Sequence, residues 1–273
     1  IKNAGAIIIG KTNVPEFGLG SHTYNPVFGP SLNPYDAKSS VGGSSGGAAA
    51  GLALQLLPVA DGSDLMGSLR NPGAFNNVIG FRPTPGLVPL SKNYKEELPC
   101  NGPMGRNVED TAMLLSTIAG FDPRSPSSLN QDPTQFAEPL KADFKNTKIG
   151  WLGDFDGYLP MENGIMDLCE ESLKTFEDLG CTVEPVKLDY SMEELWQTWL
   201  TFRHWLVRAL GLPLYNDPAK RMKLKPEYIW EVEGGAKLSG DDIARASAAR
   251  GRWYAALQKA FKEYDYLLLP TAQ

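Results

Sequence analysis

The chain has 273 residues, which is long enough for one large domain or two modest ones. Hydrophobic residues make up 42% and charged residues 21%, which excludes a disordered or fibrous chain. The formal net charge is −6 without a basic tail, which argues against an electrostatic nucleic-acid binder. The short basic patch, Lys220, Arg221, Lys223 and Lys225, is typical of a solvated face.

The sequence favours neither a membrane protein nor a disulfide scaffold. The longest apolar stretch, residues 48–60, is too short to cross a bilayer. Three cysteines without a CxxC pair fit reduced thiols, and therefore a cytoplasmic protein. Only two histidines are present and they are far apart, so no metal site is predicted.

The first 120 residues combine short regular elements with long loops. A glycine-capped turn at the start is followed by an apolar strand at 6–9. The irregular segment 18–47 ends in a glycine-rich block, and loops of that length are usually functional. The other expected elements are helices at 48–56, 69–76 and 107–119, a strand at 57–60, and loops at 61–67 and 80–105.

The rest of the chain alternates strands and helices, after a surface excursion at 122–143. Strands are predicted at 148–152, 181–186 and 266–269, and helices at 165–179, 191–210 and 241–264. This alternation indicates an α/β fold, with a mixed β-sheet core covered by helices. Three tryptophans of the second helix are expected to pack in the core, with an aromatic wall for an acyl chain as the alternative: Trp196, Trp199 and Trp205.

Two motif matches fail on their surroundings. Residues 5–12 fit the P-loop pattern, but the middle positions are Ala and three Ile, which favour a strand, and no helix start follows. Residues 43–47 fit a nucleophile elbow centred on Ser45, but residues 36–41 are too polar for the strand that an elbow requires. His204, the only histidine downstream, fits helix packing.

Two glycine-flanked serine blocks stand just before predicted helices, at 42–47 and 62–70, and a third segment follows at 80–84. Each serine alone is explained as a helix cap. Together they suggest a catalytic site, because main-chain N–H groups at a helix start can stabilise an oxyanion. Two such blocks could bring two hydroxyls into one pocket, one as the nucleophile and one to pass a proton.

The stretch 42–84 closely resembles the amidase signature family. Segments 10–17, 102–110 and 264–270 agree with the resemblance, whose specific motifs lie in the first 110 residues. The spacing between Ser44 and Ser68 also fits the family's pattern. The resemblance implies the amidase signature fold and a Ser–cis-Ser–Lys triad.

The resemblance implies roles for eight residues. Ser68 is the nucleophile, and Ser44 is the bridging serine, which follows a cis peptide bond from Gly43. The oxyanion hole is formed by main-chain N–H groups of Leu65, Met66, Gly67 and Ser68. Three further residues have supporting roles: Ser45 through a hydrogen bond, and Asp64 and Arg70 by ordering the loop.

The triad's lysine is expected about seventy residues before the bridging serine, outside these 273 residues. Lys11 belongs to a segment that follows that lysine in the family. Both ends look cut, so we expect one incomplete amidase-type domain over 1–273, inactive by itself. Within it, 1–120 is the catalytic core segment, and 121–273 is a helical cap that also completes the sheet.

The expected function is an amidohydrolase that forms an acyl-enzyme on Ser68 and releases ammonia or an amine. The expected partner is a small-molecule amide substrate, with no nucleic acid, no membrane, and no metal or organic cofactor. A homodimer, a non-catalytic relative and an amidotransferase A-type subunit remain alternatives. Met66 stands where the family usually has Gly and Gly73 where it has Ala, and Met66 is expected to narrow the pocket or to alter the loop dihedrals. The Leu65–Met66 pair makes the amidotransferase the poorer fit.

Overall fold

The computed structural model describes residues 1–90 and 98–272. The chain divides into two compact units, unit 1 (Ile1–Lys141) and unit 2 (Ala142–Gln273). The division after residue 141 lies some way beyond the expected division after residue 120. A single domain over 1–273 stays a prediction.

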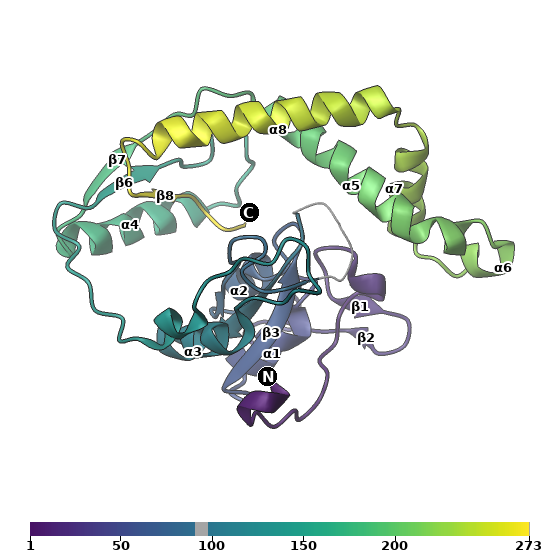
Figure 1. The fold of residues 1–273 in the computed structure, drawn as a ribbon, viewed down its shortest axis with the longest axis horizontal. Coiled ribbons are helices and arrows are strands. Elements are labelled where there is room, and N and C mark those ends of the chain that lie inside the picture. The colour runs from purple at the N-terminus through teal and green to yellow at the C-terminus, as the bar shows by residue number, and fades with distance from the viewer. Residues whose placement is uncertain (91–97, 273) are drawn as a thin grey trace. The chain divides into compact units, whose positions relative to one another are not determined.

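Unit 1 is built on a three-stranded antiparallel sheet in the order β3–β5–β4 (Figure 1). The strands are β3 (Val59–Asp64), β5 (Cys100–Gly105) and β4 (Ile79–Gly80). β3 and β5 pair from Val59 opposite Gly105 to Asp64 opposite Cys100. The helices are α1 (Gly46–Ala53), α2 (Arg70–Phe75) and α3 (Val108–Ile118), with 3-10 turns η1 (Lys2–Ala4), η2 (Glu16–Gly18) and η3 (Pro133–Ala137) and a hairpin of β1 (Tyr24–Asn25) and β2 (Gly29–Pro30).

The core of unit 1 lies where α1 meets the sheet. Ala48, Ala49 and Leu52 are buried on one side of α1 and pack with Leu69 and Met104. The small alanines allow the helix backbone to come close to the strands. This packing places the start of α1 beside the segment that joins β3 to α2.

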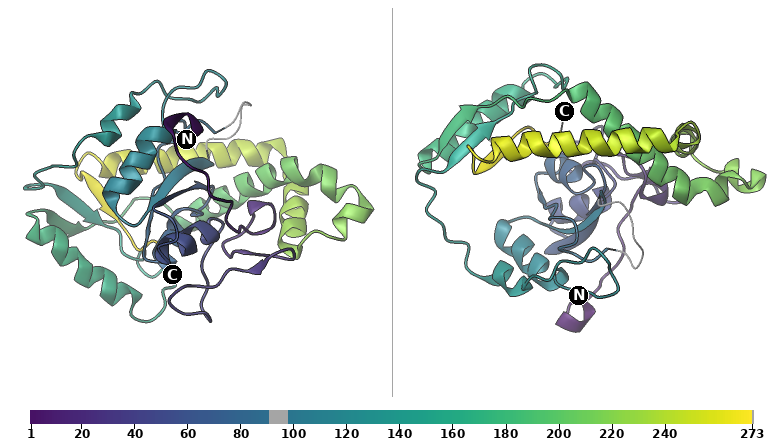
Figure 2. Two further views of the ribbon diagram at one scale, coloured as in Figure 1. Left: turned by 90° about the horizontal axis from the view of Figure 1, so that it is seen from below. Right: turned by 45° about the horizontal axis from the view of Figure 1, so that its top comes forward.

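Unit 2 has a parallel sheet in the order β7–β6–β8. The strands are β7 (Thr182–Pro185), β6 (Lys148–Trp151) and β8 (Tyr266–Leu268), and the crossover helix α4 (Ile165–Asp178) connects β6 to β7. The remaining helices are α5 (Met192–Tyr215), α6 (Pro218–Arg221), α7 (Pro226–Ala236) and α8 (Gly240–Ala260). Figures 1 and 2 show α5 running beside α7 and packing on α8. Among the described residues, no helix has the length and apolar character needed to cross a membrane.

The α/β class predicted from the sequence is confirmed. Parallel and antiparallel pairs are both present, in three separate sheets within the described residues. The predicted strand at 6–9 is wrong: this segment forms no ladder, and Ile7 and Ile9 are 88% and 71% exposed. Branched side chains favour a strand only where a neighbouring strand pairs with it.

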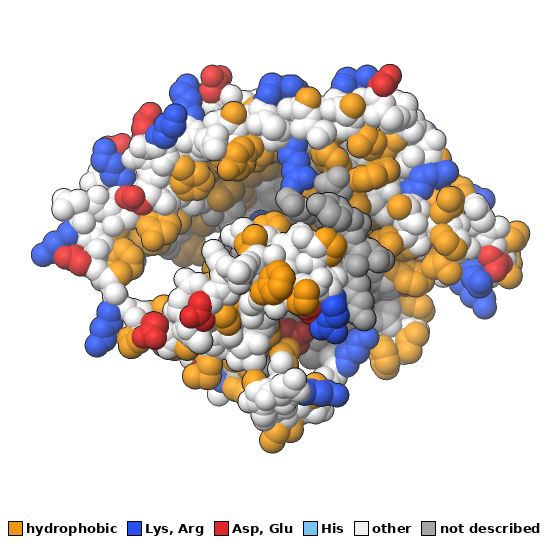
Figure 3. Space-filling view, viewed as in Figure 1, with side chains coloured by type: hydrophobic (Ala, Val, Ile, Leu, Met, Phe, Trp, Pro, Cys, Tyr) orange, Lys and Arg blue, Asp and Glu red, His pale blue; other side chains and the backbone are white. Residues whose placement is uncertain are grey.

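The tryptophans of α5 do not all pack in a core. Trp196 and Trp205 are exposed, and half-buried Trp199 stacks on Trp196 with ring centroids 4.8 Å apart. Core packing is therefore wrong for Trp196 and Trp205. Figure 3 shows hydrophobic side chains gathered along the helices of unit 2. The aromatic wall for an acyl chain stays a prediction.

Candidate active site

The first serine block is fixed by main-chain contacts. Ser44 and Ser45 are buried, and the peptide bond between Gly43 and Ser44 is cis, as the resemblance implies. The N–H of Gly47 donates to the carbonyl oxygen of Asn13 at 3.2 Å. A Cβ atom on Gly47 would lie 2.5 Å from the Asn13 nitrogen, so only glycine allows this approach. Close backbone packing thus helps to set the position of the serines.

The serines of the two blocks do not cap α1 and α2 through their side chains, as the helix-cap interpretation predicts. Ser45 occupies the N-cap position of α1, but its side chain makes no capping hydrogen bond. Its Oγ donates instead to the carbonyl oxygen of Ser63 at 3.4 Å. The N-cap position of α2 is Leu69, so Ser68 lies before the cap. The Ser45 hydroxyl therefore faces the second block rather than its own helix.

The two serine blocks meet through the main chain. The N–H of Ser45 donates to the carbonyl oxygen of Ser68 at 3.2 Å. Ser44 and Ser45 also line a cavity of about 480 Å³, together with Asp61 and Ser63 and the apolar segment 6–9. Ser68 is half-buried and is not among the residues that line this cavity. Ser68 thus lies next to Ser45, which together with Ser44 lines the cavity.

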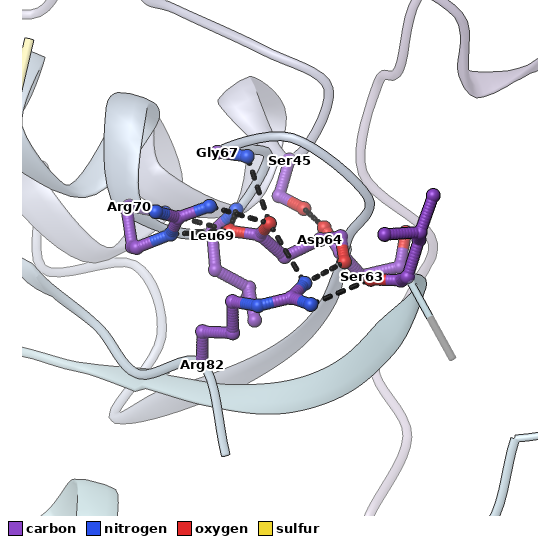
Figure 4. A network of polar contacts seen from close by, with 8 residues as sticks. Ser45, Ser63, Asp64, Gly67, Leu69, Arg70 and Arg82 are labelled. Carbon is purple, nitrogen blue, oxygen red and sulfur yellow. Dashed lines mark hydrogen bonds and ion pairs between the residues drawn. The ribbon is translucent and has the colours of Figure 1, made fainter. Parts of the chain in front are cut away.

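Asp64 organises the loop that carries Ser68, residues 65–69, which we call the Ser68 loop (Figure 4). The Asp64 side chain is completely buried at the end of β3. Its carboxylate accepts hydrogen bonds from the N–H groups of Gly67 at 2.7 Å and Leu69 at 3.1 Å. It also pairs with Arg70 Nη2 at 3.0 Å. These contacts support the ordering role that was inferred for Asp64 and Arg70.

The charge of Asp64 is maintained by its partners. Burial by itself raises the pKa of Asp64, but the hydrogen bond and charge of Arg70 and the N–H groups of Gly67 and Leu69 outweigh it. The net result is a pKa below the ordinary value of 3.8. Asp64 is therefore an ionised acceptor at neutral pH, which suits it to hold several donors.

One of the expected oxyanion donors has a partner beside the loop. The N–H of Gly67 donates to the Asp64 carboxylate, so it helps to hold the loop. Gly67 has a φ of 108°, a conformation that favours glycine, and this turns its N–H toward Asp64. Leu65, Met66 and Ser68 lie in the same turn between β3 and α2.

Arg82 belongs to the same network and was not singled out from the sequence. Its Nη1 donates to the main-chain oxygen of Asp64 and to Asp64 Oδ1, the latter at 3.1 Å, and its Nη2 donates to the carbonyl oxygen of Leu98 at 2.5 Å. Arg82 lies in the segment 80–84, but its partners Asp64 and Leu98 are 16 to 18 residues away, so the sequence offered no local signal for this contact.

Neither rejected motif gains support from the structure. Lys11 and Thr12 begin no helix, and residues 36–41 form no strand before Ser45. Within residues 1–90 and 98–272, no three His, Cys, Asp or Glu side chains are grouped so that they could hold a metal ion.

Comparison with known proteins gives consistent matches over the chain. The Amidase family model matches residues 1–273. An acylamidase of Rhodococcus erythropolis is 32% identical over 99% of this chain and 57% of its own length. The A-type subunit of the glutamyl-tRNA(Gln) amidotransferase of Thermus thermophilus is 35% identical over 99% of this chain and 61% of its own length.

Solved structures agree with these relatives. A bacterial aryl acylamidase of the amidase signature family superposes with a TM-score of 0.86 at 30% identity, covering 95% of this chain and 55% of that one. A second structure, an amidase, gives 0.80 at 25% identity and covers 97% and 57%. This chain spans between half and two thirds of the length of each of these proteins. With the family model matched from end to end, the chain belongs to the amidase signature family.

Proposed function

We propose that the protein is an amidohydrolase that cleaves the C–N bond of a small-molecule carboxylic amide through an acyl-enzyme on Ser68. The observation that carries this proposal is the meeting of the two serine blocks, from Ser45 N–H to Ser68 O, beside a loop held by Asp64. The names of two relatives, an acylamidase and an aryl acylamidase, support this substrate class.

In the proposed reaction, the Ser68 hydroxyl attacks the amide carbonyl carbon and forms a C–O bond. Its proton passes to Ser44 and on to the lysine of the triad. The carbonyl oxygen becomes an oxyanion, which the N–H groups of Leu65, Met66 and Ser68 stabilise. The C–N bond then breaks, the nitrogen takes up the proton, and ammonia or an amine leaves. Water hydrolyses the remaining ester on Ser68 and restores the hydroxyl.

A fluorophosphonate probe tests this proposal on the protein expressed from its complete reading frame. We expect covalent labelling of the peptide that contains Ser68, found by mass spectrometry, and no labelling of Ser68→Ala. Ser116→Ala is a matched control, because Ser116 lies on α3 and its hydroxyl donates to the Met113 carbonyl oxygen of the same helix. A wild-type protein that is neither labelled nor active on amides would indicate a non-catalytic relative.

An amidotransferase A-type subunit is a second candidate, because the Thermus thermophilus amidotransferase chain is 35% identical over nearly the whole chain. The two candidates differ in their need for a partner protein. Release of an aromatic amine from a simple anilide by the protein alone supports the amidohydrolase. Activity that appears only with further subunits and a tRNA-linked substrate supports the amidotransferase.

A further inference from the structure

Arg82 lies where all three strands of the unit 1 sheet approach the Ser68 loop. It lies two residues after the end of β4, while Asp64 is the last residue of β3 and Leu98 comes shortly before β5. Since Asp64 pairs with Cys100, the end of β3 and the start of β5 lie at the same end of the sheet. The Arg82 side chain, from the segment after β4, spans this end of the sheet.

The guanidinium of Arg82 binds three acceptors there. These are the main-chain oxygen and Oδ1 of Asp64, and the carbonyl oxygen of Leu98. In Figure 4, Arg82 approaches Asp64 from below and Arg70 approaches it from the left. The rigid planar fork of arginine suits such a set of acceptors, whereas a lysine ammonium is a single point charge on a flexible stem.

Arg70 and Arg82 share the carboxylate but hold it differently. The side chain of Arg70 is 47% exposed and comes from α2, which directly follows the Ser68 loop. The side chain of Arg82 is 22% exposed and also donates a hydrogen bond to the main-chain oxygen of Asp64 in β3. Arg82 thus links the carboxylate to the sheet, while Arg70 links it to a helix that adjoins the loop itself.

We propose that Arg82 is a positioning residue for acyl transfer at Ser68. Its guanidinium fixes Asp64 on the sheet, and Asp64 in turn holds the N–H groups of Gly67 and Leu69, which flank Ser68 on either side. The proposal rests on the proposed function, since it gives Arg82 a task in the reaction of Ser68.

The test replaces Arg82 in the protein expressed from its complete reading frame. For Arg82→Gln we expect kcat on an amide to fall about 10- to 100-fold, as for other residues that orient reacting groups, with KM changed less than about threefold. Arg82→Lys should fall between wild type and Arg82→Gln. In Arg82→Gly, added millimolar guanidinium should restore part of kcat. Arg124→Gln is the matched control, because Arg124 is an exposed arginine of unit 1 that pairs with Asp122.

A second measurement does not depend on activity. Hydrogen exchange at residues 65–69 should be faster in Arg82→Gln than in wild type, and unchanged in Arg124→Gln. If wild type neither hydrolyses amides nor reacts with the fluorophosphonate, the proposed function fails. The exchange data still test whether Arg82 orders the Ser68 loop.

Two results overturn the proposal. One is a kcat in Arg82→Gln within about twofold of wild type. The other is a loss of kcat with unchanged exchange at 65–69 and no rescue by guanidinium. If Arg82→Gln does not fold, Arg82→Lys with a native melting temperature decides instead: wild-type kcat overturns the proposal, and a reduced kcat supports it.

Discussion

Among the described residues, each unit contains one buried carboxylate with two nitrogen-bearing partners, and the two sites differ in what they hold. Asp64 is 0% exposed and pairs with Arg70 and Arg82. Glu231 is 2% exposed and pairs with Arg203 and with His204, whose Nδ1 lies 2.8 Å from Oε2. By burial and charge alone, the two sites would rank equally as functional candidates.

The difference lies in the main chain. Glu231 on α7 meets two adjacent side chains of α5, so it joins one helix to another. Asp64 also accepts two main-chain N–H groups and thereby shapes a loop. A buried ion pair is by itself weak evidence for function. Control of the backbone beside a serine is the better indicator, and the following predictions test this distinction.

The largest effect is expected for Asp64→Asn. The amide lacks the charge that faces Arg70 and Arg82, and one of its two acceptor oxygens becomes a donor. With the Ser68 loop loosened, kcat should fall about 10²- to 10³-fold, as for the loss of an oxyanion donor. The measurement is the hydrolysis rate per folded molecule, checked by circular dichroism. A kcat near wild type would place Asp64 in the same class as Glu231.

For Glu231→Gln we expect a loss of stability rather than of chemistry. The substitution removes the carboxylate charge that faces Arg203, and breaking a buried pair typically costs about 3–5 kcal/mol. Urea unfolding gives the free energy of unfolding, and amide hydrolysis is measured at low urea where the variant is folded. A large fall in kcat of the folded variant would break the comparison between the two carboxylates.

A smaller effect is expected for Met66→Gly, which places the family's usual residue in the Ser68 loop. If the Met66 side chain narrows the pocket, its removal should raise kcat/KM for bulky acyl groups relative to small ones by about 10-fold. Leu210→Ala is the control, because Leu210 is an exposed residue of α5 in unit 2. Parallel changes for bulky and small acyl groups would show that Met66 does not face the acyl group.

The smallest effect is expected from acid. The pKa of Asp64 is lowered in the folded protein, so the stability that Asp64 contributes is present above its unfolded value. That stability is lost as the pH falls from about 4 through the lower folded pKa. Urea unfolding of wild type at pH 3 to 6 should show this decline, and Asp64→Asn should show less of it. An equal decline in both would mean that other carboxylates dominate.

Much of the fold could be predicted where periodicity and caps agree. The helix predicted at 107–119 appears as α3, whose N-cap Asn107 accepts a hydrogen bond from the N–H of Asp110. The helix predicted at 165–179 and the strand predicted at 148–152 also appear, within a residue or two. The cis bond before Ser44 came from the family resemblance and from no propensity.

The misses have tertiary causes. β5 lies in a region expected to be loop, because Asn101, Gly102 and Pro103 disfavour strands and are held in one by pairing with β3. The helix predicted at 191–210 runs on to Tyr215, since Gly211 packs tightly against Tyr228 of α7 and does not end it. Arg82 was missed for the same reason, because its partners are distant in sequence.

The contact between Gly47 and the Asn13 main chain has a consequence for divergence among relatives. A methyl group at Gly47 would meet backbone nitrogen and oxygen, which cannot rotate aside as a side chain could. Gly47, next to the serines, therefore resists substitution, whereas the cavity is also lined by the apolar residues Ile7, Leu57 and Val59. Relatives that act on different substrates should therefore differ at these apolar lining residues rather than at Gly47.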